Sequence, residues 1–126
     1  MDNYFIQAQR VRRLIQNDFN STFSLPHLLH EHGIETSSKN KSGVDVLLAP
    51  CSLSPAPPLG DVLAAKSPLD AYVNDVLTVP ASLAGIPALC IPVQNPSGDN
   101  EPLGMQLLAQ FGNENALFEI AKVLEQ

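Results

Sequence analysis

The stretch 71–93, AYVNDVLTVPASLAGIPALCIPV, decides how this chain of 126 residues is interpreted. Almost every position in it is apolar or small, three prolines interrupt it, and Asp75 is its one charged residue. Apolar residues spaced three to four apart predict a helix over 68–79, and the apolar run that follows predicts a buried strand over 88–93. Together with the elements expected elsewhere in the chain, they give the order helix, strand, long loop, helix, strand, strand, helix, which indicates an α/β fold.

Asp75 is the residue of this stretch that most needs an explanation. At about 100° per residue it lies at the edge of the apolar helix face, beside Tyr72 and Val79, whereas Asn74 and Thr78 lie on the polar face. Two interpretations remain open. A carboxylate at such a rim can face a pocket and pair with a cation, or it can be a boundary residue that water or a neighbouring backbone group satisfies.

The other elements follow from the same patterns. Amphipathic periodicity predicts helices, short apolar runs between breakers predict strands, and the proline-rich segment 51–61 predicts a long irregular loop. The expected helices cover 4–23, 25–32, 68–79 and 113–125, and the expected strands cover 44–49, 88–93 and 103–110. Two of these strands are apolar almost throughout, as strands covered on both faces are, so the sheet is expected to be part of a larger one.

Composition excludes some classes of function. The formal net charge is −6, and residues 44–126 hold nine acidic side chains against two basic ones. A surface that acidic repels a phosphate backbone, so this part of the chain is not expected to bind nucleic acid directly. No apolar run approaches the ~20 residues that span a bilayer. The N-terminus has the features of neither a signal peptide nor a transit peptide, so we expect no membrane and no targeting segment.

The cysteines and histidines offer weak metal or redox signals. Cys51 and Cys90 are too few for a disulfide framework, so we expect reduced, mostly buried thiols. His27, His30 and His32 crowd together, and the first two could share a helix face. A metal site usually needs three or four converging ligands, and no other spacing here supplies them. The alternative is a solvent-facing helix end, and we expect no metal.

Catalytic machinery is not evident in these residues. Nucleophilic catalysis needs an activated serine or cysteine with a base in reach. No serine lies in a G-x-S-x-G elbow, and no two glycines are adjacent as a phosphate-cradling loop would require. Cys51 with a histidine as base is the remaining alternative, and no helix N-terminus supports it. We therefore expect no catalytic residue in this chain.

Several motifs resemble the C-terminal part of amidase-signature enzymes. The spacings ND-x-x-T-x-P…LAG-x-P-A and P-x-G-x-Q are fairly specific to that family. The first helix narrows the resemblance towards the A subunits of glutamyl-tRNA(Gln) amidotransferases, of the organellar type. The stretches that carry it, in order, are NYFIQAQRVRRLIQNDF (3–19), SGVDVLLAP (42–50), SPLDAYVNDVLTVPASLAGIPALCIPV (67–93), PLGMQLLAQ (102–110) and ALFEIAKVLEQ (116–126).

The resemblance implies that 1–126 is the last portion of one large α/β/α domain around a mixed sheet. It implies hydrolysis of glutamine by a Ser–cis-Ser–Lys triad, with the ammonia passed to glutamyl-tRNA on a B subunit. The complex would be a mitochondrial heterotrimer with B and C subunits, and tRNA would be reached only through the B subunit. ATP and Mg²⁺ are implied for the whole complex alone, and no cofactor for this chain. The triad lies in the family's N-terminal half, so this chain alone is expected to be inactive.

The resemblance also implies a role for Asp75. It matches the aspartate of the ND motif, which contacts the α-ammonium of the substrate, and Asn74 and Thr78 are candidates for supporting it. Two positions depart from the family pattern. Ser82 stands where an asparagine is usual, and Cys51 stands where threonine is common.

Three interpretations of function remain. The first is a fragment of a mitochondrial-type A subunit that supplies one wall of a glutamine pocket. The second is a piece of a generic amidase-signature hydrolase that acts on another small amide. The third is a non-catalytic module that binds a partner protein through an exposed apolar surface.

Overall fold

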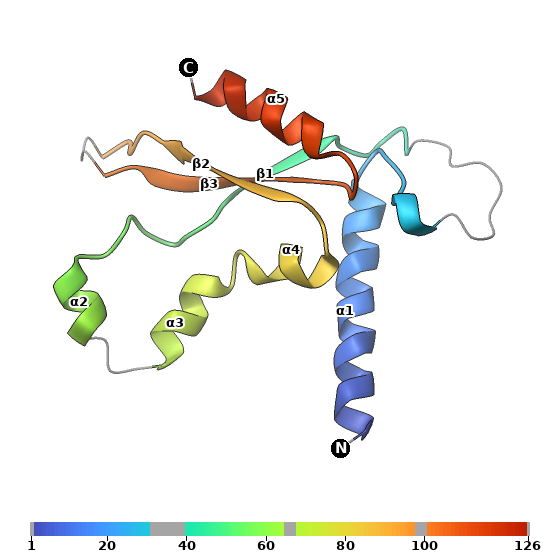
Figure 1. The fold of residues 1–126 in the computed structure, drawn as a ribbon, viewed down its shortest axis with the longest axis horizontal. Helices are drawn as coiled ribbons and strands as arrows, with labels where there is room; N and C mark the ends of the chain where they lie inside the picture. The colour runs from blue at the N-terminus through green and yellow to red at the C-terminus, as the bar shows by residue number, and fades with distance from the viewer. Residues whose placement is uncertain (1, 31–39, 65–67, 98–100, 126) are drawn as a thin grey trace.

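The computed structural model describes residues 2–30, 40–64, 68–97 and 101–125 (Figure 1). Helices pack on a small sheet in a mixed α/β arrangement. In chain order the elements are α1 (Asp2–Thr22), the short 3₁₀ turn η1 (Leu28–His30), β1 (Val46–Pro50), α2 (Leu59–Ala64), α3 (Pro68–Asp75), α4 (Val79–Ala84), β2 (Ala88–Val93), β3 (Leu103–Ala109) and α5 (Glu114–Leu124).

The three strands form one sheet in the order β1-β3-β2, with β3 in the middle. Both pairings are antiparallel, and Leu107 of β3 lies between Leu48 of β1 and Leu89 of β2. Outside the strands, Phe23 and Val44 form an isolated parallel bridge. The resemblance implies a mixed sheet for the whole domain, and the strands of this chain form an antiparallel part of such a sheet.

Helices cover the two faces of β3. The face that carries Leu108 packs on α1 and α4, in a core with Phe23, Ala81, Ala84 and Ile86. The opposite face packs on α5, in a second core formed by Ile91, Leu107, Ala109, Leu117 and Ala121. Figure 1 shows α5 on one side of the sheet and α4 with α1 on the other. Alternation along a strand sends successive side chains to opposite faces, so β3 contributes to both cores.

Helix α1 supplies hydrogen bonds to the C-terminal end of α4. The last carbonyls of a helix lack partners within it. Arg12 Nε donates to the Leu83 carbonyl at 2.8 Å, and Gln16 Nε2 donates to the Ala84 carbonyl at 3.2 Å. Gly85 then ends the helix with φ of 74°, a left-handed conformation that glycine adopts without steric cost. These bonds fix α4 against α1, although the two helices lie far apart in sequence.

The three strands lie at or close to the expected positions, whereas three other expectations were wrong. The expected helix over 25–32 is only the 3₁₀ turn η1 within the described part, and residues 31–39 lie outside it. Leu29 N donates to His27 Nδ1 at 3.2 Å, so a side chain takes the hydrogen bond that a helix would give to the backbone. The loop after β1 contains α2, whose first turn bonds back to the Pro58 carbonyl.

The expected helix over 68–79 is interrupted. Helix α3 ends at Asp75, a turn follows, and α4 begins at Val79. Pro80 explains the break, because proline has no N–H to give to the carbonyl four residues earlier and its ring clashes there. In the first turn of α4 the same proline fits, because a backbone N–H at that position would have no partner within the helix.

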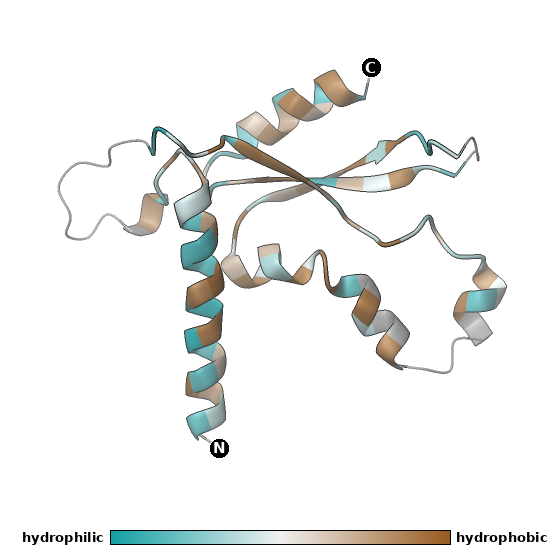
Figure 2. Ribbon diagram, turned by 180° about the vertical axis from the view of Figure 1, so that it is seen from behind, coloured by the Kyte–Doolittle hydropathy of each residue, from teal (hydrophilic) through white to brown (hydrophobic). Residues whose placement is uncertain are grey.

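Much apolar surface is left uncovered. The apolar stripe of α1 packs only in its C-terminal half, while Tyr4 near its start is 87% exposed and Tyr72 on α3 is 71% exposed. Figure 2 shows apolar segments on α1 and α3, away from the sheet. The exposed large apolar side chains on α1, α2 and α3 are Tyr4, Phe5, Ile6, Val11, Leu14, Leu59, Val62, Leu69, Tyr72 and Val73. In the described residues, no helix combines the length and apolar character needed to cross a membrane.

Replacing Phe23 by alanine should sharply destabilise the fold. Its ring is 1% exposed in the core between α1, α4 and β3, so its loss is expected to lower the free energy of unfolding by about 3–5 kcal/mol. Phe5→Ala is the matched control, because Phe5 lies on the same helix and is 66% exposed. Urea unfolding followed by circular dichroism compares the two variants. Equal losses would show that Phe23 does not anchor this core.

Candidate functional site

The turn between α3 and α4 carries the candidate substrate residue. Asp75 is the last residue of α3, and its side chain is exposed. Its carbonyl accepts two hydrogen bonds from Thr78, from the backbone N at 3.1 Å and from Oγ1 at 3.2 Å. The turn therefore closes on itself at the residue whose carboxylate is of interest. The expectation that Asp75 and Val79 flank each other on one helix was wrong, because α3 ends before Val79.

Thr78 is not placed as the helical periodicity predicts. Thr78 is half-buried in the turn and lines a cavity, so it does not belong to a polar face of α3. Its hydroxyl bonds the Asp75 carbonyl and makes no capping bond to α4. The backbone of Asn74 belongs to α3, and its side chain lies outside what the structure describes.

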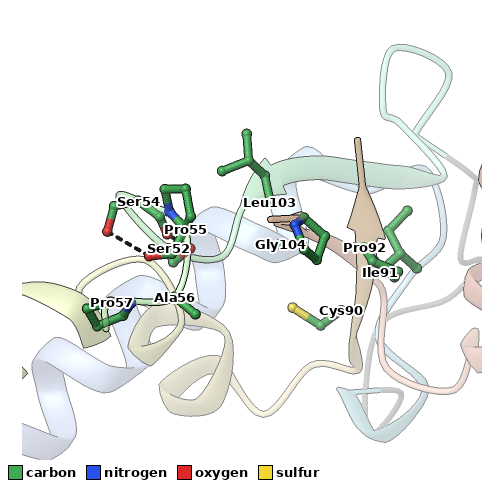
Figure 3. A pocket seen from close by; sticks show the side chains of 11 residues that line it. Ser52, Ser54, Pro55, Ala56, Pro57, Cys90, Ile91, Pro92, Leu103 and Gly104 are labelled. Atoms are coloured by element: carbon green, nitrogen blue, oxygen red, sulfur yellow. Dashed lines mark hydrogen bonds between the residues drawn. The ribbon is translucent and has the colours of Figure 1, made fainter. Parts of the chain in front are cut away.

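A cavity of about 210 Å³ lies between this turn, α4 and the sheet. Asp75 is not among its lining residues, which are Cys51, Thr78, Ala81, Ser82, Ile86, Ala88, Leu89, Cys90 and Gln106. A larger cavity of about 590 Å³ lies between the segment 52–57 and residues of β2 and β3 (Figure 3). Cys90 lines both cavities. The residues that line the two cavities include no charged side chain. Such walls suit small neutral or apolar groups, and any charge must be recognised at the rim.

Two thiols converge over Gly104. The backbone N of Cys51 donates to the Gly104 carbonyl at 3.0 Å, which continues the β1–β3 pairing by one residue. A Cβ atom at Gly104 would clash with Cys51 Sγ and would lie in ordinary contact with Cys90 Sγ, so the absent side chain makes room for the Cys51 sulfur. Cys51 is half-buried and Cys90 is exposed, so the expectation of buried thiols was wrong, although both are free.

The contact between the two cysteines makes Cys90 a poor nucleophile at neutral pH. A hydrogen bond with Cys51, partial burial and the charge of Cys51 together raise the pKa of Cys90 to about 11. The thiolate is the reactive form of cysteine. His27 is not placed to act as the base for Cys51, since it lies near Phe111, beyond the opposite end of β3.

His27 has a structural role. It is buried, and its ring stacks on Phe111 with centroids 5.0 Å apart and planes 8° from parallel. The expectation of a solvent-facing helix end was therefore wrong for this residue. The side chain of His30 and the whole of His32 lie outside the described part. Within that part, no group of three histidine, cysteine or acidic side chains is placed to hold a metal ion.

Gln106 was not singled out by the sequence. Its side chain is 4% exposed at the centre of β3, and Nε2 donates to the Pro50 carbonyl at 3.0 Å and to the Leu77 carbonyl at 2.8 Å. One amide therefore joins the end of β1 to the α3–α4 turn. The only sequence signal was the P-x-G-x-Q spacing over 102–106, which by itself gives no partner for the amide.

Comparison with known proteins identifies the family. A family model described as Amidase matches residues 1–118. The chain belongs to the amidase family. It is 56% identical, over its whole length, to the A subunit of the mitochondrial glutamyl-tRNA(Gln) amidotransferase of Tuber melanosporum, and it covers 25% of that protein. The corresponding protein of Coccidioides posadasii is 46% identical over 136 aligned positions, and the chain covers 27% of it.

A solved structure supports the same assignment. The crystal structure of the glutamyl-tRNA(Gln) amidotransferase A subunit from Thermotoga maritima matches 95% of the chain with a TM-score of 0.71 and 30% identity, and the match covers 22% of that chain. The resemblance to amidase-family A subunits and the α/β fold are thereby confirmed. The chain spans about a quarter of the length of these relatives.

Alkylation of Cys90 should be slow and should speed up when Cys51 is removed. A pKa of about 11 in place of the ordinary 9.0 leaves roughly 100-fold less thiolate at pH 8. The rate with iodoacetamide is therefore expected to rise with pH towards 11. Cys51→Ala removes the hydrogen bond and should accelerate labelling of Cys90 at pH 8, as peptide mass spectrometry can follow. The control is Ser52→Ala, and equal rates in all three proteins would contradict the thiol contact.

Proposed function

We propose that this chain supplies one wall of the glutamine pocket of a mitochondrial-type glutamyl-tRNA(Gln) amidotransferase A subunit. In this proposal the Asp75 carboxylate pairs with the α-ammonium of glutamine, and Asn74 and Thr78 support it. The observation that carries the proposal is the placement of Asp75, exposed at the end of α3 on a turn that is tied to the sheet. Identity of 56% to such a protein over the whole chain supports the choice of substrate.

The local electrostatics suit an ammonium group. A carboxylate and an ammonium form a charge-assisted hydrogen bond, which is stronger than a neutral one. Asp75 lies at the C-terminal end of α3, where the aligned peptide dipoles place partial negative charge. The negative charge of Asp75 and the helix dipole of α3 therefore both attract a cation to this end of the helix. The uncharged cavity walls nearby leave this discrimination to the rim.

The chemical step is proposed to come from elsewhere in the protein. The chain matches about a quarter of its relatives, and we assign the Ser–cis-Ser–Lys triad to the remaining part of such a protein. The uncovered apolar surface of α1 and α3 is then a contact with the rest of the amidase domain. By the same reasoning the partners are B and C subunits in the mitochondrion, and tRNA is reached through the B subunit. ATP and Mg²⁺ would serve only the amidation of the tRNA-bound glutamate on the partner subunit.

The isolated chain should not hydrolyse glutamine. Purified 1–126 at concentrations up to tens of micromolar should release ammonia from glutamine no faster than buffer, because none of its described residues forms the expected triad. A coupled ammonia assay measures this. Turnover that a Cys51→Ala variant abolishes would contradict the proposal and place the nucleophile in this chain.

A hybrid enzyme tests the role of Asp75. Residues 1–126 replace the last quarter of the Tuber melanosporum relative, and the hybrid is expressed with its partner subunits. Asp75→Asn should raise KM for glutamine by about 10- to 100-fold, the usual effect of losing a hydrogen bond to a charged group. The same variant should leave hydrolysis of glutaric acid monoamide, which lacks the α-ammonium, within about threefold, since the lost bond involves only that group.

The controls separate the alternatives. Asp61→Asn makes the same chemical change at an exposed position in the first turn of α2 and should leave both substrates unaffected. Equal losses on both substrates in Asp75→Asn would indicate a structural role. No loss on either would favour a generic amidase that acts on a neutral amide.

A further inference from the structure

The amide of Gln106 is the link between the sheet and the turn that carries Asp75. Its nitrogen donates to two carbonyls from distant parts of the chain, Pro50 at the end of β1 and Leu77 in the α3–α4 turn. The side chain is 4% exposed, so water does not compete freely for these bonds. A buried polar group that loses its partner is costly, and this amide therefore holds both segments in place.

Only a double donor of this length fits the position. Both partners are carbonyl oxygens, which accept and cannot donate. Glutamine brings two N–H groups on one nitrogen, so it can satisfy both acceptors at once. A glutamate of the same shape would turn carboxylate oxygens towards two carbonyls, and a methionine of similar volume would leave both carbonyls without this donor.

The turn needs such a tether to hold a defined position. The two hydrogen bonds from Thr78 to the Asp75 carbonyl stay within the turn and do not reach the sheet. Helix α3 leads away from α4 and α1 (Figure 1), and its apolar side chains Leu69, Tyr72 and Val73 are exposed. The Gln106 amide bonds to the carbonyl of Leu77, which lies two residues after Asp75 in the chain. This hydrogen bond fixes the position of the turn relative to β3.

We propose that Gln106 is a positioning residue for substrate recognition: it fixes the α3–α4 turn so that the Asp75 carboxylate meets the α-ammonium of glutamine. This inference rests on the proposed function. Gln106 touches no substrate in this account and acts through Asp75. Its loss should therefore weaken recognition of the ammonium and spare the reacting amide, because the proposed function assigns the catalytic triad to residues outside this chain.

A double-mutant cycle in the hybrid enzyme tests the proposal. Gln106→Met, Asp75→Asn and the double variant are assayed with glutamine and with glutaric acid monoamide. Gln106→Met should raise KM for glutamine by about tenfold, with kcat for the monoamide within about threefold of the parent. The double variant should lose little more than Asp75→Asn alone, because the positioned group is already gone. Gln94→Met is the matched control, since Gln94 is exposed after β2.

Each outcome has a distinct meaning. Equal losses on both substrates, or full additivity with Asp75→Asn, would overturn the positioning role and leave the proposed function intact. If Asp75→Asn does not separate the two substrates, the proposed function fails first. If Gln106→Met does not yield folded protein, Gln106→Asn, whose shorter amide can retain one donor, takes its place. A substrate-selective loss smaller than that of Asp75→Asn supports the role, and an unselective loss overturns it.

Discussion

Two buried amides, Gln106 in β3 and Gln110 directly after its last residue, join parts of the chain that the sheet does not pair. Gln106 ties the end of β1 to the α3–α4 turn, and Gln110 Nε2 donates to Asn20 Oδ1 at 3.1 Å and to the Leu25 carbonyl at 3.2 Å. Gln110 thus reaches α1 and the segment that follows it. Leu108 lies between them and fills the core under α1 and α4. The layer of helices on this face is therefore held by apolar packing at its centre and by an amide at each side.

Local sequence patterns indicated the regular elements better than their ends. The apolar runs around Leu47, Ile91 and Leu107 placed the three strands, although in this structure β1 and β2 are only partly covered and β3 alone is largely buried. The expected helix over 68–79 stops before Pro80, but it misses the end of α3 at Asp75 and the start of α4 at Val79, because apolar periodicity continues from Tyr72 to Val79. Pro80 is compatible with the first turn of a new helix, and that second helix was not predicted.

The candidate site was predicted in part. The ND motif pointed to Asp75, and the structure gives it an exposed place at a helix end, which is a property of the local chain. Gln106 and the Cys51–Cys90 contact depend on pairing between segments far apart in sequence, so no local pattern could indicate them. His27 shows the same limit, because its burial follows from the ring of Phe111, which lies more than eighty residues away.

The strand order also constrains how this segment is made. Strand β3 is the middle of the sheet but the last of the strands in the described residues, and Val46 cannot pair before Ala109 is made. At about 5–20 residues per second, a ribosome takes roughly 3 to 12 s to make the residues between them. Until β3 is made, β1 and then β2 lack their partner strand, and the core around Phe23 lacks Leu108. Strand edges without a partner can pair with other chains, so this part of the sheet is exposed to aggregation during that interval.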